Sequence, residues 1–327
     1  MQADPILDVR NLRIGFPVDS TYSYVVDGVS FAVREAEVVG VLGESGAGKT
    51  LIAEAVMGLT KSPPARVDGS VLFRGQDVLK MDDAQLSALR GKELAMILQD
   101  PTSALNPVFR VGDQVAEPIQ IHLGKDKKTA WQMAIDIFKN MVGIPSAEAR
   151  VKDYPHQFSG GMKQRVVIGM GLSCRPLLLI ADEPTCSLDV TIQAQILELI
   201  QGLVSELRTA VLYISNDLGV VSQMCQDIMI LYAGTIVERG RVEYVLNAPQ
   251  HPYTKGLIRS VPKLGVKRLE PIPGTIPTLG EYPEGCRFRP RCNLAMDRCA
   301  CRPAPPLFKA SHEQEVACWK FEGALHG

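Results

Sequence analysis

Residues 43–50 read Gly-Glu-Ser-Gly-Ala-Gly-Lys-Thr and match the phosphate-loop pattern G-x-x-x-x-G-K-[ST]. The flanking sequence supplies the context that this pattern requires. Residues 37–43 are almost entirely apolar, which predicts a short buried strand, and a helix is expected from Gly48 to about Leu59. The stretch therefore predicts a strand, a glycine-rich loop and a helix that together bind a nucleoside triphosphate.

The residue types of this loop suit phosphate. Glycines let successive backbone N–H groups face phosphate oxygens, and the N-terminus of the following helix adds its positive end. We expect Lys49 to reach the β- and γ-phosphates and Thr50 to ligate Mg²⁺. The predicted nucleotide-binding residues of the loop are Gly43, Ser45, Gly46, Gly48, Lys49 and Thr50.

A second element supplies carboxylates. Residues 178–181 form an apolar run that ends in Asp182 and Glu183. A carboxylate at the end of a buried strand is the usual companion of a phosphate loop. We expect Asp182 to hold Mg²⁺ through water and Glu183 to orient and polarise the attacking water.

The predicted fold class is α/β. Residues 7–35 alternate apolar and polar positions, as half-buried strands do, and residues 104–176 are mostly helical in pattern. Further strands are expected at residues 71–73, 94–98, 177–181 and 210–215, with a helix over residues 191–207. Strands that alternate with helices predict a parallel or mixed sheet covered on both faces.

Composition excludes several classes of protein. The 327 residues carry 35 basic and 36 acidic side chains, so no basic surface for nucleic acid is expected. No apolar stretch approaches the roughly 18 residues of a membrane span, and residues 1–10 lack the pattern of a secretion signal. The sequence therefore predicts a cytosolic chain that binds a membrane, if at all, as a peripheral subunit.

A third motif lies at residues 158–165, which read Phe-Ser-Gly-Gly-Met-Lys-Gln-Arg. It is similar to the signature motif of ATP-binding-cassette (ABC) ATPases, so the chain resembles that family in particular. The resemblance implies that Ser159, Gly160 and Gly161 contact the γ-phosphate of an ATP bound by an opposite subunit. It also implies a P-loop (RecA-like) ABC nucleotide-binding domain with an antiparallel β subdomain and a helical subdomain.

The same resemblance implies further roles. Gln99 matches the glutamine that senses Mg²⁺ and water and links to the permease, and Ser187-Leu188-Asp189 matches the D-loop at the dimer interface. Phe16 lies where the family places an aromatic residue that stacks on adenine. Mg²⁺ ligation is thus expected from Thr50, Gln99 and Asp182.

One position departs from the family pattern. Asn216 stands where the family has a histidine that contacts the γ-phosphate. Asparagine donates a hydrogen bond but carries no charge and shuttles no proton. We hypothesise that this chain pairs with a different cassette subunit and that its own site, with Lys49, Glu183 and Asn216, hydrolyses ATP weakly; the alternative is that asparagine is tolerated.

The proline-rich residues 249–327 resemble the C-terminal extension of ATPase subunits of oligopeptide, dipeptide and nickel importers. The resemblance rests on His-Pro-Tyr-Thr at residues 251–254, Ile-Pro-Gly-Thr-Ile-Pro at 272–277 and Gly-Cys-Arg-Phe-Arg-Pro-Arg-Cys at 285–292. We therefore expect an ABC ATPase domain over residues 1–248, with its helical subdomain at about 104–176, and a separate C-terminal module over 249–327.

The extension holds four cysteines spaced C-x₅-C-x₆-C-x₁₈-C, namely Cys286, Cys292, Cys299 and Cys318. Four thiolates suit either Zn²⁺ or a [4Fe–4S] cluster, and unligated buried thiols are the third alternative. The spacing lacks the C-x₂-C of structural zinc, and the resemblance favours the iron–sulfur cluster. Cys301 would be the spare thiol.

The resemblance implies an ATPase that energises peptide import across the cytoplasmic membrane, with ATP and Mg²⁺ as cofactors. Its expected partners are a second ABC ATPase subunit, two transmembrane permease subunits and an external substrate-binding protein, and its expected place is the cytoplasmic face of the membrane. The alternatives are a transporter of nickel or another small solute, a soluble ABC protein, or an iron–sulfur redox protein.

Overall fold

The computed structural model describes residues 4–60, 62–186, 188–261 and 270–323. The chain divides into two compact units. Unit 1 comprises residues 1–7, 33–37 and 73–212, and unit 2 comprises residues 8–32, 38–72 and 213–327. Each unit is discontinuous in sequence, so each is assembled from contacts between distant segments.

Unit 1 combines a few parallel strands with most of the helices. β6 (Leu94–Ile97) and β7 (Leu178–Asp182) pair in parallel, from Leu94 opposite Leu178 to Ile97 opposite Ala181, and β8 (Ala210–Ser215) begins beside β7. All five residues of β7 are buried. The helices of this unit are α2 (Asp83–Leu89), α3 (Pro101–Ala104), α4 (Val111–Leu123), α5 (Lys127–Asp136), α6 (Ala147–Arg150), α7 (Gly160–Leu172) and α8 (Val190–Leu207).

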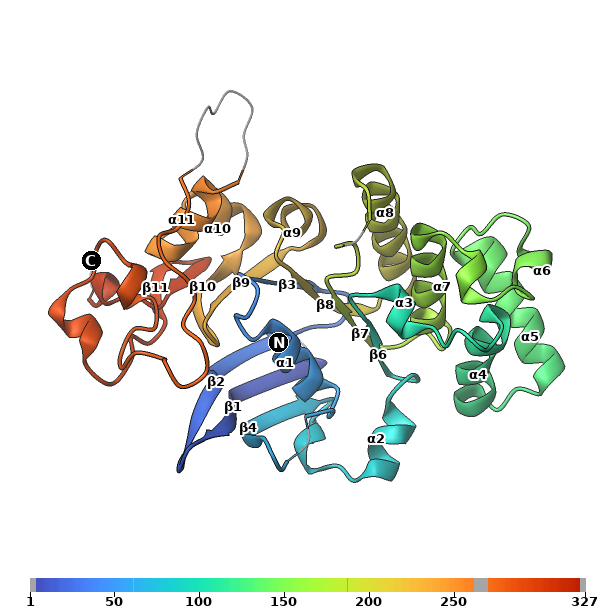
Figure 1. The fold of residues 1–327 in the computed structure, drawn as a ribbon, viewed down its shortest axis with the longest axis horizontal. Coiled ribbons are helices and arrows are strands. Elements are labelled where there is room, and N and C mark those ends of the chain that lie inside the picture. Colours follow the sequence, from blue (N-terminus) through green and yellow to red (C-terminus); the bar gives the residue numbers. More distant parts are fainter. Residues whose placement is uncertain (1–3, 61, 187, 262–269, 324–327) are drawn as a thin grey trace. The chain divides into compact units, whose positions relative to one another are not determined.

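Helices α4 to α7 fill the region predicted to be helical and gather together in Figure 1. α7 contacts α3, α4, α8 and β6, so it links this helical group to the strands of unit 1. Its small residues permit close packing, because a Cβ on Gly169 would lie 2.8 Å from the Ile137 side chain. The lysines at residues 125, 127 and 128 are exposed at the start of α5.

Unit 2 contains two sets of strands. β1 (Leu7–Val18) lies between β2 (Thr21–Val33) and β4 (Arg66–Phe73). A second set has the order β11-β12-β10-β9-β3, in which β3 (Val38–Leu42) pairs in parallel with β9 (Asp227–Tyr232) and β9 pairs antiparallel with β10 (Thr235–Arg241). The helices of unit 2 are α1 (Lys49–Val56), α9 (Leu218–Met224), α10 (Val242–Asn247) and α11 (Pro252–Arg259).

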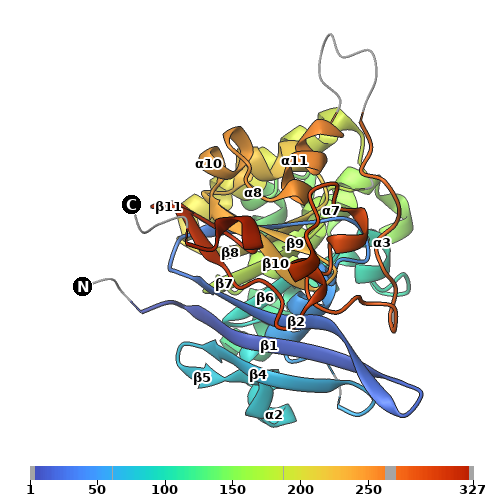
Figure 2. The same cartoon turned by 90° about the vertical axis from the view of Figure 1, so that its left-hand side faces the viewer.

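The C-terminal extension continues the sheet of unit 2. β12 (Gln314–Val316) pairs antiparallel with β10 and with β11 (Phe308–Ser311), so β12 lies between β10 and β11, both of which are labelled in Figure 2. Over residues 249–261 and 270–323, the helical elements of the extension besides α11 are short 3₁₀ turns, as its many prolines predict. The pairing joins the extension to the strands that precede it, and the division of the chain at residue 249 stays a prediction.

The predicted strands and helices around the motifs are confirmed. The strand at residues 37–43 is β3, whose five residues are all buried, and the helix after the phosphate loop is α1, which ends at Val56. Among the described residues, no helix has the length and apolarity needed to cross a membrane.

Candidate nucleotide site

The phosphate loop in unit 2 lies between β3 and α1. Gly46 and Gly48 have φ values of 82° and 98°, a region that favours glycine, and Gly48 is the N-cap of α1 with no side-chain cap of its own. Gly43 must lack a side chain, because its Cβ would lie 2.3 Å from the carbonyl oxygen of Leu231 on β9. The predicted loop geometry is therefore imposed by contacts as well as by local preference.

Lys49 is held over this loop. Its side chain is almost completely buried, and its Nζ donates to the carbonyl oxygens of Gly43 at 3.0 Å and Glu44 at 3.2 Å. Ser45, Gly46 and Thr50 are exposed. The loop thus places a lysine cation against its own backbone, beside exposed positions where a phosphate would bind.

Asn216 also belongs to unit 2, where it is exposed after the last residue of β8. The turn that carries it is well defined. Ser215 Oγ accepts from the backbone N–H of Asp217 at 2.9 Å, and Asp217 caps α9 by accepting from Gly219 N at 2.8 Å. The asparagine is therefore presented on a short ordered connection between a buried strand and a helix.

In unit 1, two of the predicted catalytic residues, Gln99 and Glu183, are in contact. Asp182 ends β7 and is almost completely buried, and Glu183 follows it with a left-handed φ of 45°. Gln99 Nε2 donates to Glu183 Oε2 at 3.2 Å, across 84 residues of sequence. An unusual backbone conformation at a non-glycine residue is typical of functional sites, and here it directs Glu183 toward Gln99.

The signature residues begin α7. Ser159 caps the helix by accepting from Met162 N at 3.4 Å, and Ser159 and Gly160 are exposed. Gly161 cannot carry a side chain, because its Cβ would lie 2.6 Å from Ile192 on α8. Phe158, the departure from the usual leucine, is buried with the guanidinium of Arg150 over its ring.

Two other predicted residues are placed without a decisive role. Asp189 caps α8 by accepting from Thr191 N at 3.1 Å and Ile192 N at 3.0 Å, while Ser187 of the same motif lies outside the described residues. Phe16 is half-buried near the end of β1. Its neighbour in the hairpin, Tyr24, donates from its hydroxyl to Asp68 at 2.9 Å.

The four predicted cysteine ligands lie in one region of unit 2. Burial is the largest cause that raises the pKa of the Cys286 thiol to about 11, and the thiols of Cys299, Cys292 and Cys318 raise it further. None of the eight cysteines forms a disulfide in the part of the chain that the structure describes. That these four cysteines hold a cluster or Zn²⁺ stays a prediction, and Cys301 is exposed.

Three of these thiols also lie close to backbone N–H groups. Cys286 accepts a backbone N–H from Phe288, Cys292 from Leu294, and Cys318 from Lys320, each two residues further along the chain. Such bonds favour a charged sulfur and occur around metal-bound thiolates. Within the described ranges, however, no three Cys, His, Asp or Glu side chains converge as they would around a single metal ion.

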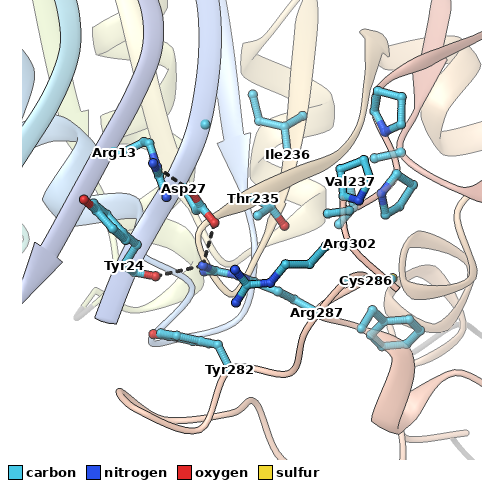
Figure 3. Close-up of a pocket in the computed structure, with 18 of the residues that line it drawn as sticks. Arg13, Tyr24, Asp27, Thr235, Ile236, Val237, Tyr282, Cys286, Arg287 and Arg302 are labelled. Carbon is cyan, nitrogen blue, oxygen red and sulfur yellow. Dashed lines mark hydrogen bonds and ion pairs between the residues drawn. The ribbon is translucent and has the colours of Figure 1, made fainter. Parts of the chain in front are cut away.

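A cavity of about 1150 Å³ separates the β1–β2 hairpin and β10 from the extension, all in unit 2 (Figure 3). Its charges are satisfied internally. Arg287 donates to Asp27 at 3.0 Å and to the carbonyl oxygen of Tyr24 at 2.9 Å, and Arg13 pairs with the same carboxylate at 2.8 Å. Arg287 therefore attaches the extension to the β1–β2 hairpin at the wall of this cavity.

The sequence did not predict the residues that attach the extension to β10 and to the phosphate loop. Glu238 on β10 is fully buried and accepts from Gln250 N, His251 N and Gln314 Nε2. Arg291 and Tyr253 both contact Glu44 of the phosphate loop. The sequence signals were the motifs at residues 251–254 and 285–292, which indicated the family but not these contacts.

The arrangement of strands, loop and helices matches a known class. Two solved dimeric structures of the ATP-binding cassette MJ0796, one in a post-hydrolysis state with ADP and Pi, each have a TM-score of 0.64 and 22% identity. Each match covers 72% of this chain and 98% of the other. The fold is therefore that of an ATP-binding cassette.

Sequence comparison narrows the class. Family profiles match residues 26–186 (ABC transporter) and 237–299 (oligopeptide/dipeptide transporter, C-terminal region). The oligopeptide transport ATP-binding protein OppD of Haemophilus influenzae is 42% identical over 97% of both chains, and OppD of Salmonella typhimurium is 43% identical over 97% of this chain and 94% of its own. A putative peptide import ATP-binding protein of Brucella melitensis is 41% identical over 98% and 99%. The chain belongs to this family of ABC transporter ATP-binding proteins.

Proposed function

We propose that this chain hydrolyses ATP to energise the import of peptides as one subunit of an ABC transporter. The observation that carries the proposal is the coexistence of a complete phosphate loop with a C-terminal region of the oligopeptide/dipeptide type. The relatives named above are peptide transport proteins, which favours peptides over nickel or another small solute. The same relatives favour transport over a soluble ABC protein or a redox protein.

Within this function each motif has one role. Lys49 and the loop N–H groups bind the phosphates of ATP, and Thr50, Asp182 and Gln99 hold Mg²⁺. Glu183 orients the attacking water, and its contact with Gln99 supports that role, because the amide fixes the orientation of the carboxylate. Phe16 stacks on the adenine.

The remaining motif residues act on a second cassette. Ser159, Gly160 and Gly161 bind the γ-phosphate held by that partner, as the exposure of Ser159 and Gly160 at the start of α7 allows. Asp189 lies at the same interface. The assembly comprises a second ABC ATPase subunit, two transmembrane permease subunits and an external substrate-binding protein, with this chain at the cytoplasmic face of the membrane.

The cysteines of the extension are assigned to a [4Fe–4S] cluster, with Zn²⁺ as the alternative. The proposal is supported by the four-cysteine set itself, because four thiolates suit such a cluster. When bound, the cluster would supply a structural crosslink between distant parts of the extension. The thiols of Cys286, Cys292, Cys299 and Cys318 would hold it, and the N–H groups of Phe288, Leu294 and Lys320 would stabilise the sulfurs.

We also propose that the site containing Asn216 is catalytically weak and that the partner subunit's site drives transport. The test is the steady-state ATPase activity of the reconstituted complex with Glu183→Gln in this chain alone. Activity near the unmutated level supports a weak site. A collapse of activity means that asparagine is tolerated and that both sites hydrolyse ATP.

The transport function itself is tested by ATP hydrolysis in the reconstituted complex. Peptide-loaded binding protein should stimulate hydrolysis several-fold, and Lys49→Ala in this chain should remove ATP binding at its own loop. Hydrolysis that is indifferent to the loaded binding protein would contradict the proposal.

A further inference from the structure

The C-terminal extension contacts the phosphate loop through one arginine. Arg291 donates from Nη1 to Glu44 Oε2 at 2.7 Å and from Nη2 to Glu44 Oε1 at 3.1 Å, which is a bidentate ion pair. Its Nε donates to the carbonyl oxygen of Pro273 at 2.7 Å. Only 5% of the arginine side chain is exposed, so its charge is directed at Glu44 rather than at solvent.

A second residue of the extension holds the backbone of the same glutamate. The hydroxyl of Tyr253 on α11 accepts from Glu44 N at 3.1 Å. Tyr253 is completely buried against Tyr232 and Phe288, with ring centroids 4.7 Å and 5.4 Å away. A rigid aromatic group therefore positions the backbone N–H of Glu44 in the loop.

The negative charge of Glu44 disfavours the binding of a triphosphate to this loop. Glu44 places a carboxylate in a loop that binds a triphosphate, and like charges repel at this range. The carboxylate is 30% exposed, and Lys49 donates to the carbonyl oxygen of Glu44. The cation that neutralises the Glu44 side chain is Arg291. Burial lowers the pKa of Arg291, but the contacts with Glu44 outweigh it and raise that pKa above its usual value, so the guanidinium stays charged.

We propose that Arg291 is a positioning residue for ATP, which neutralises Glu44 and thereby lets the phosphate loop accept the triphosphate. The proposal rests on the proposed function, because it assumes that this loop binds ATP. It makes nucleotide affinity dependent on the extension, 247 residues away in sequence. An extension that is displaced or misfolded would leave Glu44 uncompensated in the loop.

The experiment is equilibrium binding of a fluorescent Mg²⁺–ATP analogue to the full-length chain. Arg291→Met should weaken binding roughly tenfold, because it leaves an unpaired charge near the phosphates. Adding Glu44→Gln to that variant should restore the affinity to within about threefold of the original chain, although the double variant still lacks the ion pair. Recovery of ATP affinity in the double variant would therefore show that Arg291 acts by neutralising Glu44, because a purely structural contact would stay lost.

Arg298→Met is the matched control. Arg298 also pairs with a glutamate of the extension, Glu322, and lies over an aromatic ring, Trp319, but it has no contact with the loop. Its replacement should leave ATP affinity unchanged. If Arg291→Met fails to fold, Arg291→Lys keeps the cation and should bind ATP nearly as well as the original chain.

Two results would overturn the proposal: unchanged affinity in Arg291→Met, or an affinity that Glu44→Gln fails to restore. Lys49→Ala distinguishes these from a failure of the proposed function. If Lys49→Ala binds the analogue as well as the original chain does, the loop is not the ATP site and the function itself is wrong.

Discussion

Gln99 and Glu183 lie 84 residues apart in sequence, and their side chains are joined by a hydrogen bond of 3.2 Å. Gln99 follows β6 and precedes the helical group, while Glu183 follows the neighbouring strand β7. Because the two strands are parallel, their carboxyl ends bring both residues to one edge of the sheet. A displacement of the segment after Gln99 would therefore reach the proposed catalytic glutamate directly.

Replacement of Gly43 by alanine should disable the phosphate loop. The new Cβ would lie 2.3 Å from the backbone oxygen of Leu231, so the loop must shift, at a cost of about 1–3 kcal/mol in unfolding free energy. ATP binding should fall with it. Gly202→Ala on α8 is the control, because no atom lies within 4 Å of its Cβ, and it should stabilise the chain by about 0.5–1 kcal/mol. Denaturant unfolding measures the unfolding free energy of both variants. An unchanged unfolding free energy in Gly43→Ala would contradict the close approach of Gly43 to the Leu231 oxygen.

Asn216→His should strengthen this chain's own site. A histidine at the end of β8 supplies the charge and proton transfer that an amide lacks. In a complex whose partner subunit carries an inactivated catalytic glutamate, we expect ATP turnover to rise several-fold. Asn216→Ala serves as the control and should not raise it. Equal turnover in the histidine variant and the original chain would show that this position does not limit hydrolysis.

Acid should destabilise the extension through His251. Burial, followed by the charge of Lys255, lowers the pKa of this histidine from 6.5 to about 3. Between these values the unfolded chain binds a proton that the folded chain does not, so stability falls as the pH drops below 6.5, by up to about 1.4 kcal/mol per pH unit.

His251→Asn tests this prediction. Asparagine keeps an acceptor for Tyr253 N, which His251 Nδ1 accepts at 3.1 Å, but it does not titrate. Thermal unfolding of the variant should depend less on pH between about 3 and 6.5 than that of the original chain. An identical dependence in both would assign the acid sensitivity to other groups.

The cysteine assignment predicts a specific metal content. Cys286→Ser should reduce the iron and acid-labile sulfide of the purified complex, because one of four ligands is lost. Cys301→Ser should retain both, since the exposed Cys301 is outside the set. Zinc in place of iron in the original complex would favour the alternative metal, and loss of iron on replacing Cys301 would contradict the assigned ligands.

Local sequence sufficed for features that depend on neighbouring residues. The strand–loop–helix around residues 43–50 and the capped starts of α7 and α8 are specified by a few adjacent residues. The strand β9, with the sequence Asp-Ile-Met-Ile-Leu-Tyr, was not anticipated, although it is an apolar run like β3. Its pairing with β3 spans almost 190 residues, which no short window of sequence reveals.

The contacts of the extension could not be predicted for the same reason. The pair Glu44–Arg291 joins two short motifs, each of which reads locally as a loop. Nothing in either motif specifies the partner of its charge, because long-range pairing depends on how β10, β12 and α11 pack. The sequence therefore indicated which segments matter, while the folded chain was needed to connect them.

The central claim is that ATP hydrolysis by this chain energises peptide import. The most direct measurement is uptake of a labelled oligopeptide into proteoliposomes that contain the complete transporter, with binding protein and peptide on one side and ATP at the cassettes. We predict uptake that requires hydrolysable ATP and fails when peptide is replaced by a nickel chelate. Uptake of the chelate in place of the peptide, or peptide uptake that proceeds without ATP, would contradict the account.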